Sequence, residues 1–119
     1  MLRSFEPFFN KAGNALELGS SKGHFTKRLS KIFNSLTCVE ASSDAIDEAK
    51  QKVPSNVNFI NGLFEDVELP HKYDNIILTH VLEHLDDPVR ILKRINDEWL
   101  NDGGSLFLVT PNAMAPSRQ

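Results

Sequence analysis

Glycines and carboxylates within or just after two short apolar runs are the residues whose types and spacing could bind a ligand. The run over residues 15–18, which contains Glu17, ends at Gly19, and Gly23 follows just before an amphipathic helical pattern. Glycine lets the backbone approach a bound molecule closely, and a helix N-terminus offers unpaired N–H groups and a partial positive charge. This turn therefore predicts a site for an anionic or nucleotide-like ligand.

A second carboxylate, Glu40, ends the apolar run over residues 36–39. A carboxylate at such a strand end can accept hydrogen bonds from both hydroxyls of a ribose, and it stands about twenty residues beyond the glycine turn, as in dinucleotide-binding folds. The pairing of the turn with Glu40 favours a ribose-containing ligand. The alternative is that Glu17 and Glu40 are solvated charges at strand ends.

His80, Glu83 and His84 form the third group that could do chemistry. They formally match His-x-x-Glu-His, the zinc motif of inverted zinc peptidases, which requires a helix. His80 directly follows an apolar strand pattern, and a clear helix start comes only at Asp87, so this reading is disfavoured. A neutral imidazole suits general-base catalysis near pH 7, so His80 and His84 are candidate bases. The structural alternative is that His84 packs beside the following helix.

The segments that must position these residues alternate between strand-like and helix-like patterns. The expected strands cover residues 14–18, 36–39, 57–60, 73–78 and 105–109. The expected helices cover residues 22–33, residues 43–52, and a segment from Asp87-Pro88 to a stop at Asp102-Gly103-Gly104. Alternating helices and near-continuous apolar strands indicate an α/β protein with a parallel sheet covered on both faces. Ligands of such sheets bind beyond the carboxyl ends of the strands.

Local signals define the helix starts and one buried face. Ser42 or Ser43 is the expected N-cap of the second helix, and Asp87 that of the third, with proline at its first position. The buried face of the third helix is expected to consist of Val89, Leu92, Ile95 and Trp99.

Composition limits the classes of protein to consider. The 119 residues suffice for one domain, and the net charge of -3 gives no reason to expect nucleic-acid binding. A single cysteine, Cys38, excludes an internal disulfide and is expected to be buried and inert. Because no signal peptide or membrane-spanning pattern is visible, we expect no membrane partner and a cytoplasmic location.

The glycine turn departs from two common nucleotide motifs. The dinucleotide fingerprint Gly-x-Gly-x-x-Gly would need glycine where Ser21 and His24 stand, and no Gly-Lys-Ser/Thr sequence is present for a phosphate-binding loop. The pattern acidic-x-Gly-x-Gly-x-Gly is met by Glu17, Gly19 and Gly23, with Ser21 replacing the middle glycine.

Residues 15–26, 39–42 and 73–88 together resemble class I S-adenosylmethionine-dependent methyltransferases, in particular the small-molecule branch that includes ubiquinone- and menaquinone-biosynthesis enzymes. The resemblance extends over residues 14–112. It implies a Rossmann-like, doubly wound parallel sheet of about five strands in the order 3-2-1-4-5, with helices on both faces. It also implies S-adenosyl-L-methionine as cofactor, S-adenosyl-L-homocysteine as product, and a small-molecule acceptor with an oxygen or nitrogen nucleophile, such as a sugar, a quinone precursor or a natural product.

The resemblance also assigns roles to residues. The turn over residues 17–23 would hold the methionine part of the cofactor, Glu40 the ribose hydroxyls, and Thr79 and His80 would face the transferred methyl. Leu63 stands where an aspartate usually contacts the adenine amino group, so backbone groups of Leu63 and Phe64 are expected to serve instead. The cofactor-binding residues so assigned are Glu17, Gly19, Ser20, Ser21, Lys22, Gly23, Glu40, Ala41, Ser42, Leu63, Phe64, Thr79 and His80.

A metal role is the less favoured reading of the histidine segment. Some relatives carry Glu-x-x-Glu-His there and bind a divalent ion that orients substrate hydroxyls. Glu83 and His84 match that pattern, whereas His80 replaces the first glutamate. We therefore expect no metal, with Glu83 and His84 as the ligands in the alternative.

The resemblance divides the chain into a lead-in segment (residues 1–13), a cofactor-binding domain (14–112) and a tail (113–119). Such enzymes usually continue with two more strands and a helix, so the fifth strand here would be an edge that invites pairing with another chain in a homodimer. An engineered truncation, a proteolytic fragment and a naturally short protein are the three explanations, and a fragment is favoured. The alternatives to a methyltransferase are a non-catalytic cofactor-binding module or partner subunit and, less favoured, a nicotinamide-dependent oxidoreductase.

Overall fold

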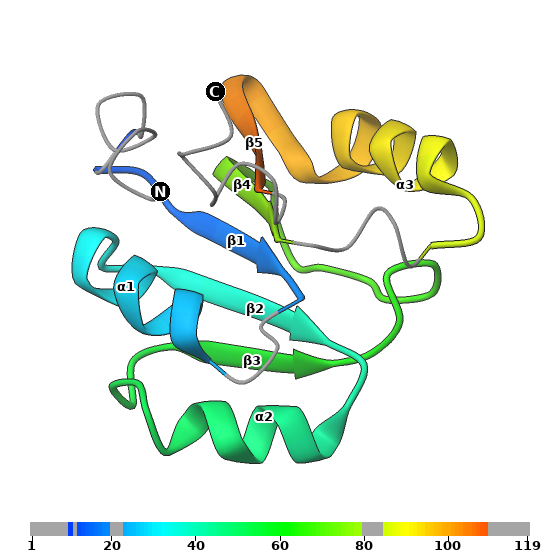
Figure 1. Cartoon of the computed structure of the whole chain (residues 1–119). Coiled ribbons are helices and arrows are strands. Elements are labelled where there is room, and N and C mark those ends of the chain that lie inside the picture. The colour runs from blue at the N-terminus through cyan, green and yellow to red at the C-terminus, as the bar shows by residue number, and fades with distance from the viewer. Residues whose placement is uncertain (1–9, 11, 20–22, 80–84, 110–119) are drawn as a thin grey trace, which may run out of the picture.

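The structure, a computed structural model, describes residues 10, 12–19, 23–79 and 85–109. Its centre is a five-stranded parallel sheet with the strand order β3-β2-β1-β4-β5 (Figure 1). The strands are β1 (Ala15–Leu18), β2 (Leu36–Glu40), β3 (Asn58–Asn61), β4 (Tyr73–Thr79) and β5 (Leu100–Val109). The helices are α1 (His24–Ile32), α2 (Ser43–Lys50) and α3 (Pro88–Arg94), which continues as the π-helical turn η4 (Ile95–Trp99). The predicted α/β class and strand order are confirmed.

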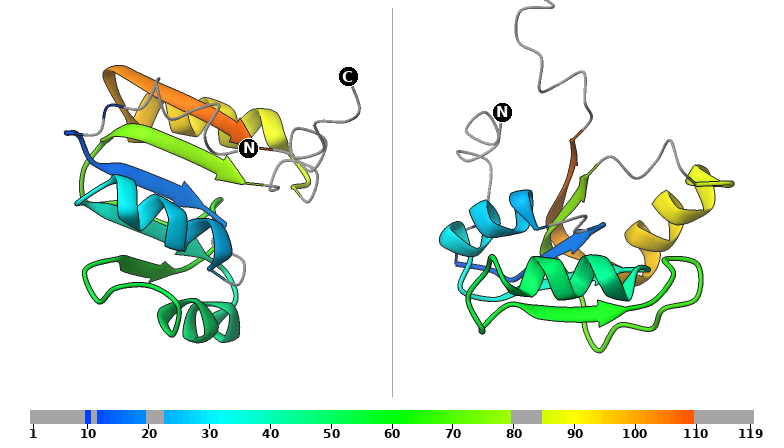
Figure 2. Two further views of the ribbon diagram at one scale, coloured as in Figure 1. Left: turned by 60° about the vertical axis from the view of Figure 1, so that its left-hand side comes forward. Right: turned by 60° about the horizontal axis from the view of Figure 1, so that its bottom comes forward.

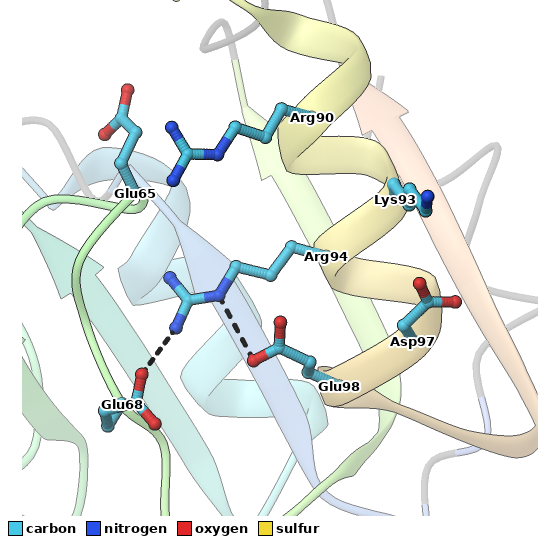
Figure 3. Close-up of a pocket in the computed structure, with 7 residues that line it drawn as sticks. All are labelled: Glu65, Glu68, Arg90, Lys93, Arg94, Asp97 and Glu98. Atoms are coloured by element: carbon cyan, nitrogen blue, oxygen red, sulfur yellow. Dashed lines mark hydrogen bonds and ion pairs between the residues drawn. The ribbon is translucent and has the colours of Figure 1, made fainter.

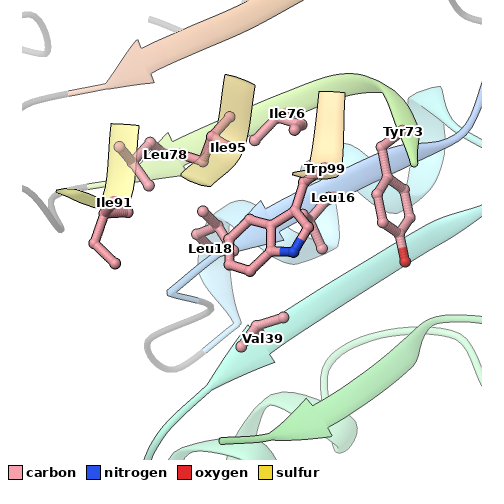
Figure 4. Close-up of a cluster of buried hydrophobic side chains, with 9 residues drawn as sticks. All are labelled: Leu16, Leu18, Val39, Tyr73, Ile76, Leu78, Ile91, Ile95 and Trp99. Atoms are coloured by element: carbon pink, nitrogen blue, oxygen red, sulfur yellow. The ribbon is translucent and has the colours of Figure 1, made fainter. Parts of the chain in front are cut away.

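Alternating residues of the central strands build two cores, one on each face of the sheet. Ala15 and Ile77 belong to the core beneath α1, where Leu29 and Phe33 are buried. Leu16 and Ile76 point to the opposite face, toward α3 and η4 (Figure 4). Figure 2 shows α1 and α2 on one side of the sheet and α3 on the other. Because both faces are covered, the strands are nearly continuously apolar.

The helix starts follow the predicted caps. The Ser42 hydroxyl accepts a hydrogen bond from the Ala45 N–H at 3.2 Å, so Ser42, not Ser43, is the N-cap of α2. The Asp87 carboxylate accepts from the Arg90 N–H at 3.1 Å and caps α3, with Pro88 in the first turn. None of the helices in the described ranges is long and apolar enough to cross a bilayer.

The end of the last helix differs from the prediction. The helix ends at Trp99, and β5 already begins at Leu100, so Asp102-Gly103-Gly104 does not terminate a helix. These residues form a bulge inside β5: Tyr73 pairs with Leu100 and Asn75 with Ser105, which leaves residues 101–104 opposite Asp74 alone. Gly103 has φ 79, a left-handed conformation that glycine adopts without strain. It therefore forms part of the bulge and does not end a helix.

The buried face of the last helix agrees with the prediction except at Val89. Ile95 and Trp99 are buried and Leu92 is partly buried against the same core, but Val89 is 71% exposed and Ile91 is buried. The Leu100 N–H donates to the Ile95 carbonyl, five residues back, so the last turn is wider than an α-helical turn. The buried side chains of Ile91, Ile95 and Trp99 follow one another at intervals of four residues, and Val89 falls outside this row.

Candidate cofactor site

The carboxyl ends of the parallel strands meet at one edge of the sheet (Figure 1). Leu18 of β1 is in register with Val39 of β2 and Leu78 of β4, and Glu40 is in register with Asn61 of β3. The Gly19 N–H donates to the Val39 carbonyl at 2.8 Å. The glycine turn, Glu40 and the residues after β3 are therefore neighbours, as a site at the edge of a parallel sheet requires.

The two glycines of the turn are required by the backbone. Gly19 and Gly23 have φ values of 86 and 90, in the left-handed region that other residues rarely adopt. A Cβ atom on Gly23 would also lie 2.8 Å from the Ala49 Cα, so glycine lets α1 start close against α2. The Gly23 carbonyl accepts the first helical hydrogen bond of α1, from the Lys27 N–H at 2.9 Å. Ser20, Ser21 and Lys22 lie outside the described residues.

Glu17 is fully buried, so the alternative of a solvated charge at a strand end is wrong for this residue. Its Oε1 accepts hydrogen bonds from the Thr26 hydroxyl at 2.5 Å and the Cys38 thiol at 3.3 Å. Oε2 is buried and has no partner among the described residues. Burial raises the pKa of Glu17 to about 7, although both hydrogen bonds act in the opposite direction. An uncompensated buried oxygen is able to accept a donor from a bound molecule.

Cys38 is a free, buried thiol, as predicted. Burial is the main cause that raises its pKa, and the neighbouring Glu17 carboxylate acts in the same direction. The thiol therefore stays protonated and serves as a weak donor to Glu17 rather than as a nucleophile.

Glu40 connects the ends of β2 and β3. Its Oε2 accepts from the Ser42 N–H at 3.0 Å. Its backbone carbonyl accepts from the Asn61 side-chain amide at 3.0 Å and from the Gly62 N–H at 3.1 Å. The Asn61 amide donates to the Ala41 carbonyl as well, at 2.9 Å. The two segments predicted to hold ribose and adenine are thus one hydrogen-bonded unit, which the sequence did not reveal.

Residues after Gly62 form a single helical turn. The Leu63 carbonyl accepts from the N–H groups of Asp66 and Val67 at 3.1 and 2.8 Å, so both of its lone pairs are used. The Leu63 side chain is 53% exposed. The N–H groups of Leu63 and Phe64 have no partner in the part of the chain that the structure describes. Both N–H groups are therefore available as backbone donors, and their contact with adenine stays a prediction.

A hollow of about 380 Å³ lies between this turn and the last helix (Figure 3). Charged side chains of both signs line it: Glu65, Glu68, Arg90, Lys93, Arg94, Asp97 and Glu98. None of them was predicted to bind the cofactor. Arg94 is the member with the most hydrogen bonds, and the sequence reading missed it because an arginine on a helix is usually a solvated residue.

The candidate catalytic and metal residues lie outside the described part of the chain. His80, Glu83 and His84 belong to residues 80–84, and of Thr79 only the backbone is described, where it ends β4 in register with Val109. Within the described ranges no group of three His, Cys, Asp or Glu residues is arranged to hold a metal ion. The roles of these residues in proton transfer or metal binding stay predictions.

The chain matches known proteins over most of its length. Nodulation protein S of Azorhizobium caulinodans is 36% identical over 111 residues, which cover 88% of this chain and 53% of that protein. An uncharacterized methyltransferase of Bacillus mycoides is 31% identical over 103 residues, which cover 85% of this chain and 49% of the relative. The chain thus spans about half the length of these curated relatives.

Solved structures show the same fold. N-methyltransferase NodS from Bradyrhizobium japonicum WM9, in complex with S-adenosyl-L-homocysteine, has a TM-score of 0.74 and 26% identity, covering 82% of this chain and 52% of that chain. The DhpI–S-adenosylhomocysteine complex has a TM-score of 0.80 and 26% identity, covering 90% of this chain and 52% of that chain.

The strand order, together with a glycine turn at the carboxyl edge, defines a Rossmann-like protein of the class I methyltransferase type. The chain belongs to the methyltransferase-domain family, which matches residues 2–119. The resemblance stated from the sequence is confirmed.

Proposed function

We propose that this chain is the cofactor-binding part of an S-adenosylmethionine-dependent methyltransferase that acts on a small-molecule acceptor. The observation that carries the proposal is the unit at the sheet edge, in which the glycine turn and Glu40 are neighbours and the end of β3 is hydrogen-bonded to Glu40. The cofactor-binding domain comprises residues 14–112 in this proposal.

The described residues fit the cofactor group by group. The methionine part is assigned to the glycine turn that follows the buried Glu17. Oε2 of Glu17 has no donor among the described residues, and the ammonium of the cofactor could provide one. Glu40 supplies a carboxylate for the ribose hydroxyls, with Ala41 and Ser42 directly after it. The N–H groups of Leu63 and Phe64 serve the adenine ring. Ser20, Ser21, Lys22, Thr79 and His80 complete the proposed set.

The bound cofactor supplies a methyl group activated by its sulfonium, so the protein mainly aligns the acceptor with that methyl. Where the acceptor carries a proton, we assign its removal to an imidazole nitrogen of His80 or His84. No metal ion is needed in this scheme, and Glu83 and His84 are its ligands in the alternative.

An oxygen or nitrogen nucleophile is proposed for the acceptor. The similarity to NodS, which is named an N-methyltransferase, favours nitrogen. The net charge of -3 gives no reason to propose a nucleic acid as the substrate. A homodimer is part of the proposal, with β5 as the strand at the edge of the sheet that would pair. A cytoplasmic location is also proposed, and the free Cys38 thiol suits a reducing compartment.

A ligand comparison tests the proposed cofactor. S-Adenosylhomocysteine should raise the thermal midpoint of the chain in a concentration-dependent way, whereas NAD should not. A shift with NAD alone would favour the oxidoreductase alternative. Binding of S-adenosylhomocysteine without methyl transfer to any acceptor, measured in a full-length protein, would favour a non-catalytic module.

A further inference from the structure

Arg94, the last residue of α3, connects this helix to the turn after β3. Its side chain is only 11% exposed. The guanidinium donates to the Phe64 carbonyl at 2.6 Å, to the Val67 carbonyl, and to Glu68 Oε2 at 2.9 Å. Nε donates to Glu98 Oε1 at 3.3 Å (Figure 3). One side chain thus fixes two backbone carbonyls that lie far from it in the sequence.

The carbonyls that Arg94 binds have no hydrogen-bond partner within their own helical turn. The turn over residues 63–67 uses the Leu63 carbonyl for its own hydrogen bonds, and the carbonyls at the end of such a turn lack partners within it. A cationic side chain satisfies them as it does at a helix C-terminus. The planar fork of arginine suits several acceptors at once, which lysine cannot reproduce.

The π-helical turn η4 holds Arg94 in place. The guanidinium carbon lies 4.7 Å from the centre of the Trp99 ring. Arg94 and Trp99 are five residues apart, the spacing that a π turn brings onto one side of a helix. The Trp99 ring and Glu98 therefore hold the guanidinium in the orientation in which it binds the carbonyls of Phe64 and Val67.

We propose that Arg94 is a positioning residue for cofactor binding, which holds residues 62–67 so that the backbone of Leu63 and Phe64 is preorganised for the adenine. Gly62 and Asn61 extend the connection from this turn to Glu40, the proposed ribose ligand. With Leu63 in place of an aspartate, the position of the backbone decides adenine recognition. Ordering the loop in advance removes an entropic cost of binding. This inference rests on the proposed function.

The test compares Arg94→Lys and Arg94→Gln with Arg90→Gln as the matched control. Arg90 lines the same hollow four residues earlier on α3, and its side chain makes no hydrogen bond or ion pair with the residues that the structure describes. Calorimetric titration with S-adenosylhomocysteine and 5′-methylthioadenosine gives affinity and stoichiometry separately. Hydrogen exchange at the amides of residues 63–67 and the fluorescence of Trp99, the single tryptophan of the chain, report on the loop.

We expect Arg94→Lys to weaken both ligands by the same factor, about tenfold, with unchanged stoichiometry. Exchange at residues 63–67 should accelerate about tenfold or more. The Trp99 emission should differ from that of the wild-type protein, because the guanidinium over the ring is lost. Arg90→Gln should match the wild-type protein in each measurement. Should Arg94→Gln fail to fold, Arg94→Lys, which retains charge and stem, is sufficient for the comparison.

Two results would overturn the role of Arg94. One is wild-type affinity in Arg94→Lys. The other is a reduced stoichiometry with unchanged affinity, which would mean that Arg94 stabilises only the fold. If the wild-type protein binds neither ligand, the proposed function fails, and unchanged exchange of the loop in Arg94→Lys would then separately refute the positioning of residues 62–67.

Discussion

At the scale of single residues, Glu17 is the only buried acidic side chain among the residues that the structure describes. It is a buried carboxyl whose pKa is raised to about 7, and one oxygen has no partner among the described residues. The folded protein therefore holds the Glu17 proton more tightly than the unfolded chain does. The stability that this preference contributes is complete below pH 4.5 and is lost as the pH rises through about 7.

The substitution Glu17→Gln should remove this pH dependence, because the amide cannot ionise. Relative to Glu17→Gln, the free energy of unfolding of the wild-type protein should fall by about 3 kcal/mol between pH 4.5 and 7. Urea unfolding at several pH values measures the difference. Parallel pH profiles for the two proteins would show that Glu17 titrates normally in the folded state.

Leu63 offers a gain-of-affinity experiment. Its side chain is 53% exposed, so replacing it should cost little packing. Leu63→Asp introduces the carboxylate that usually contacts the adenine amino group and should tighten S-adenosylhomocysteine binding about three- to tenfold. Leu63→Asn, of the same size without the charge, should gain less. Weaker binding by Leu63→Asp in calorimetry would place the adenine elsewhere.

At the scale of elements, the start of α1 depends on Gly23 for two separate reasons. Gly23 has φ 90, and a Cβ atom there would meet Ala49 of α2, whereas Gly103, with φ 79, has nothing within 4 Å. Gly23→Ala should therefore destabilise the fold by about 2–5 kcal/mol, and Gly103→Ala by about 1–2 kcal/mol. Denaturant unfolding of both variants isolates the packing contribution. Equal losses would mean that α1 does not pack closely against α2.

Several features of these elements could be predicted from the sequence because their signals are local. The Ser42 and Asp87 caps and the alternation of apolar strands with helices each depend on neighbouring residues. The end of the last helix could not, because Asp102-Gly103-Gly104 is equally suited to stop a helix and to form a bulge. The π turn could not be predicted either, because it depends on a backbone hydrogen bond from the Leu100 N–H to the Ile95 carbonyl, which residue identity does not reveal. Val89, at the start of α3, was wrongly placed in the buried row, in which Ile91 lies instead.

Contacts between distant residues explain what the sequence did not reveal about the site. Arg94 binds backbone carbonyls thirty residues away at Phe64, and carbonyls leave no trace in residue identity. Asn75, fully buried in β4, donates to the carbonyls of Asn10 and Asn14 at 2.9 and 3.0 Å and anchors the segment before β1. Glu17 gained its partners Thr26 and Cys38 only through the packing of α1 and β2 against β1.

At the scale of the whole molecule, the sheet edge combines four strands into one proposed site for a ribose-containing cofactor. The chain spans about half the length of the curated relatives that it matches. The described residues to which we assign a role are proposed to bind the cofactor, and none is proposed to bind the acceptor. Cofactor binding is therefore the part of the proposed function that can be measured with this chain alone. Glu40, at the end of β2, is the side chain on which that claim depends most.

Calorimetric titration of Glu40→Ala with S-adenosylhomocysteine is the most direct test. The matched control is Asp47→Ala, which removes an exposed carboxylate from α2. The wild-type chain and Asp47→Ala should bind the ligand equally, and Glu40→Ala should bind at least about tenfold more weakly while remaining folded, because the ribose hydroxyls lose a charged acceptor. Absence of binding by the wild-type chain, or equal affinity of Glu40→Ala and the wild-type chain, would contradict a cofactor site at this edge.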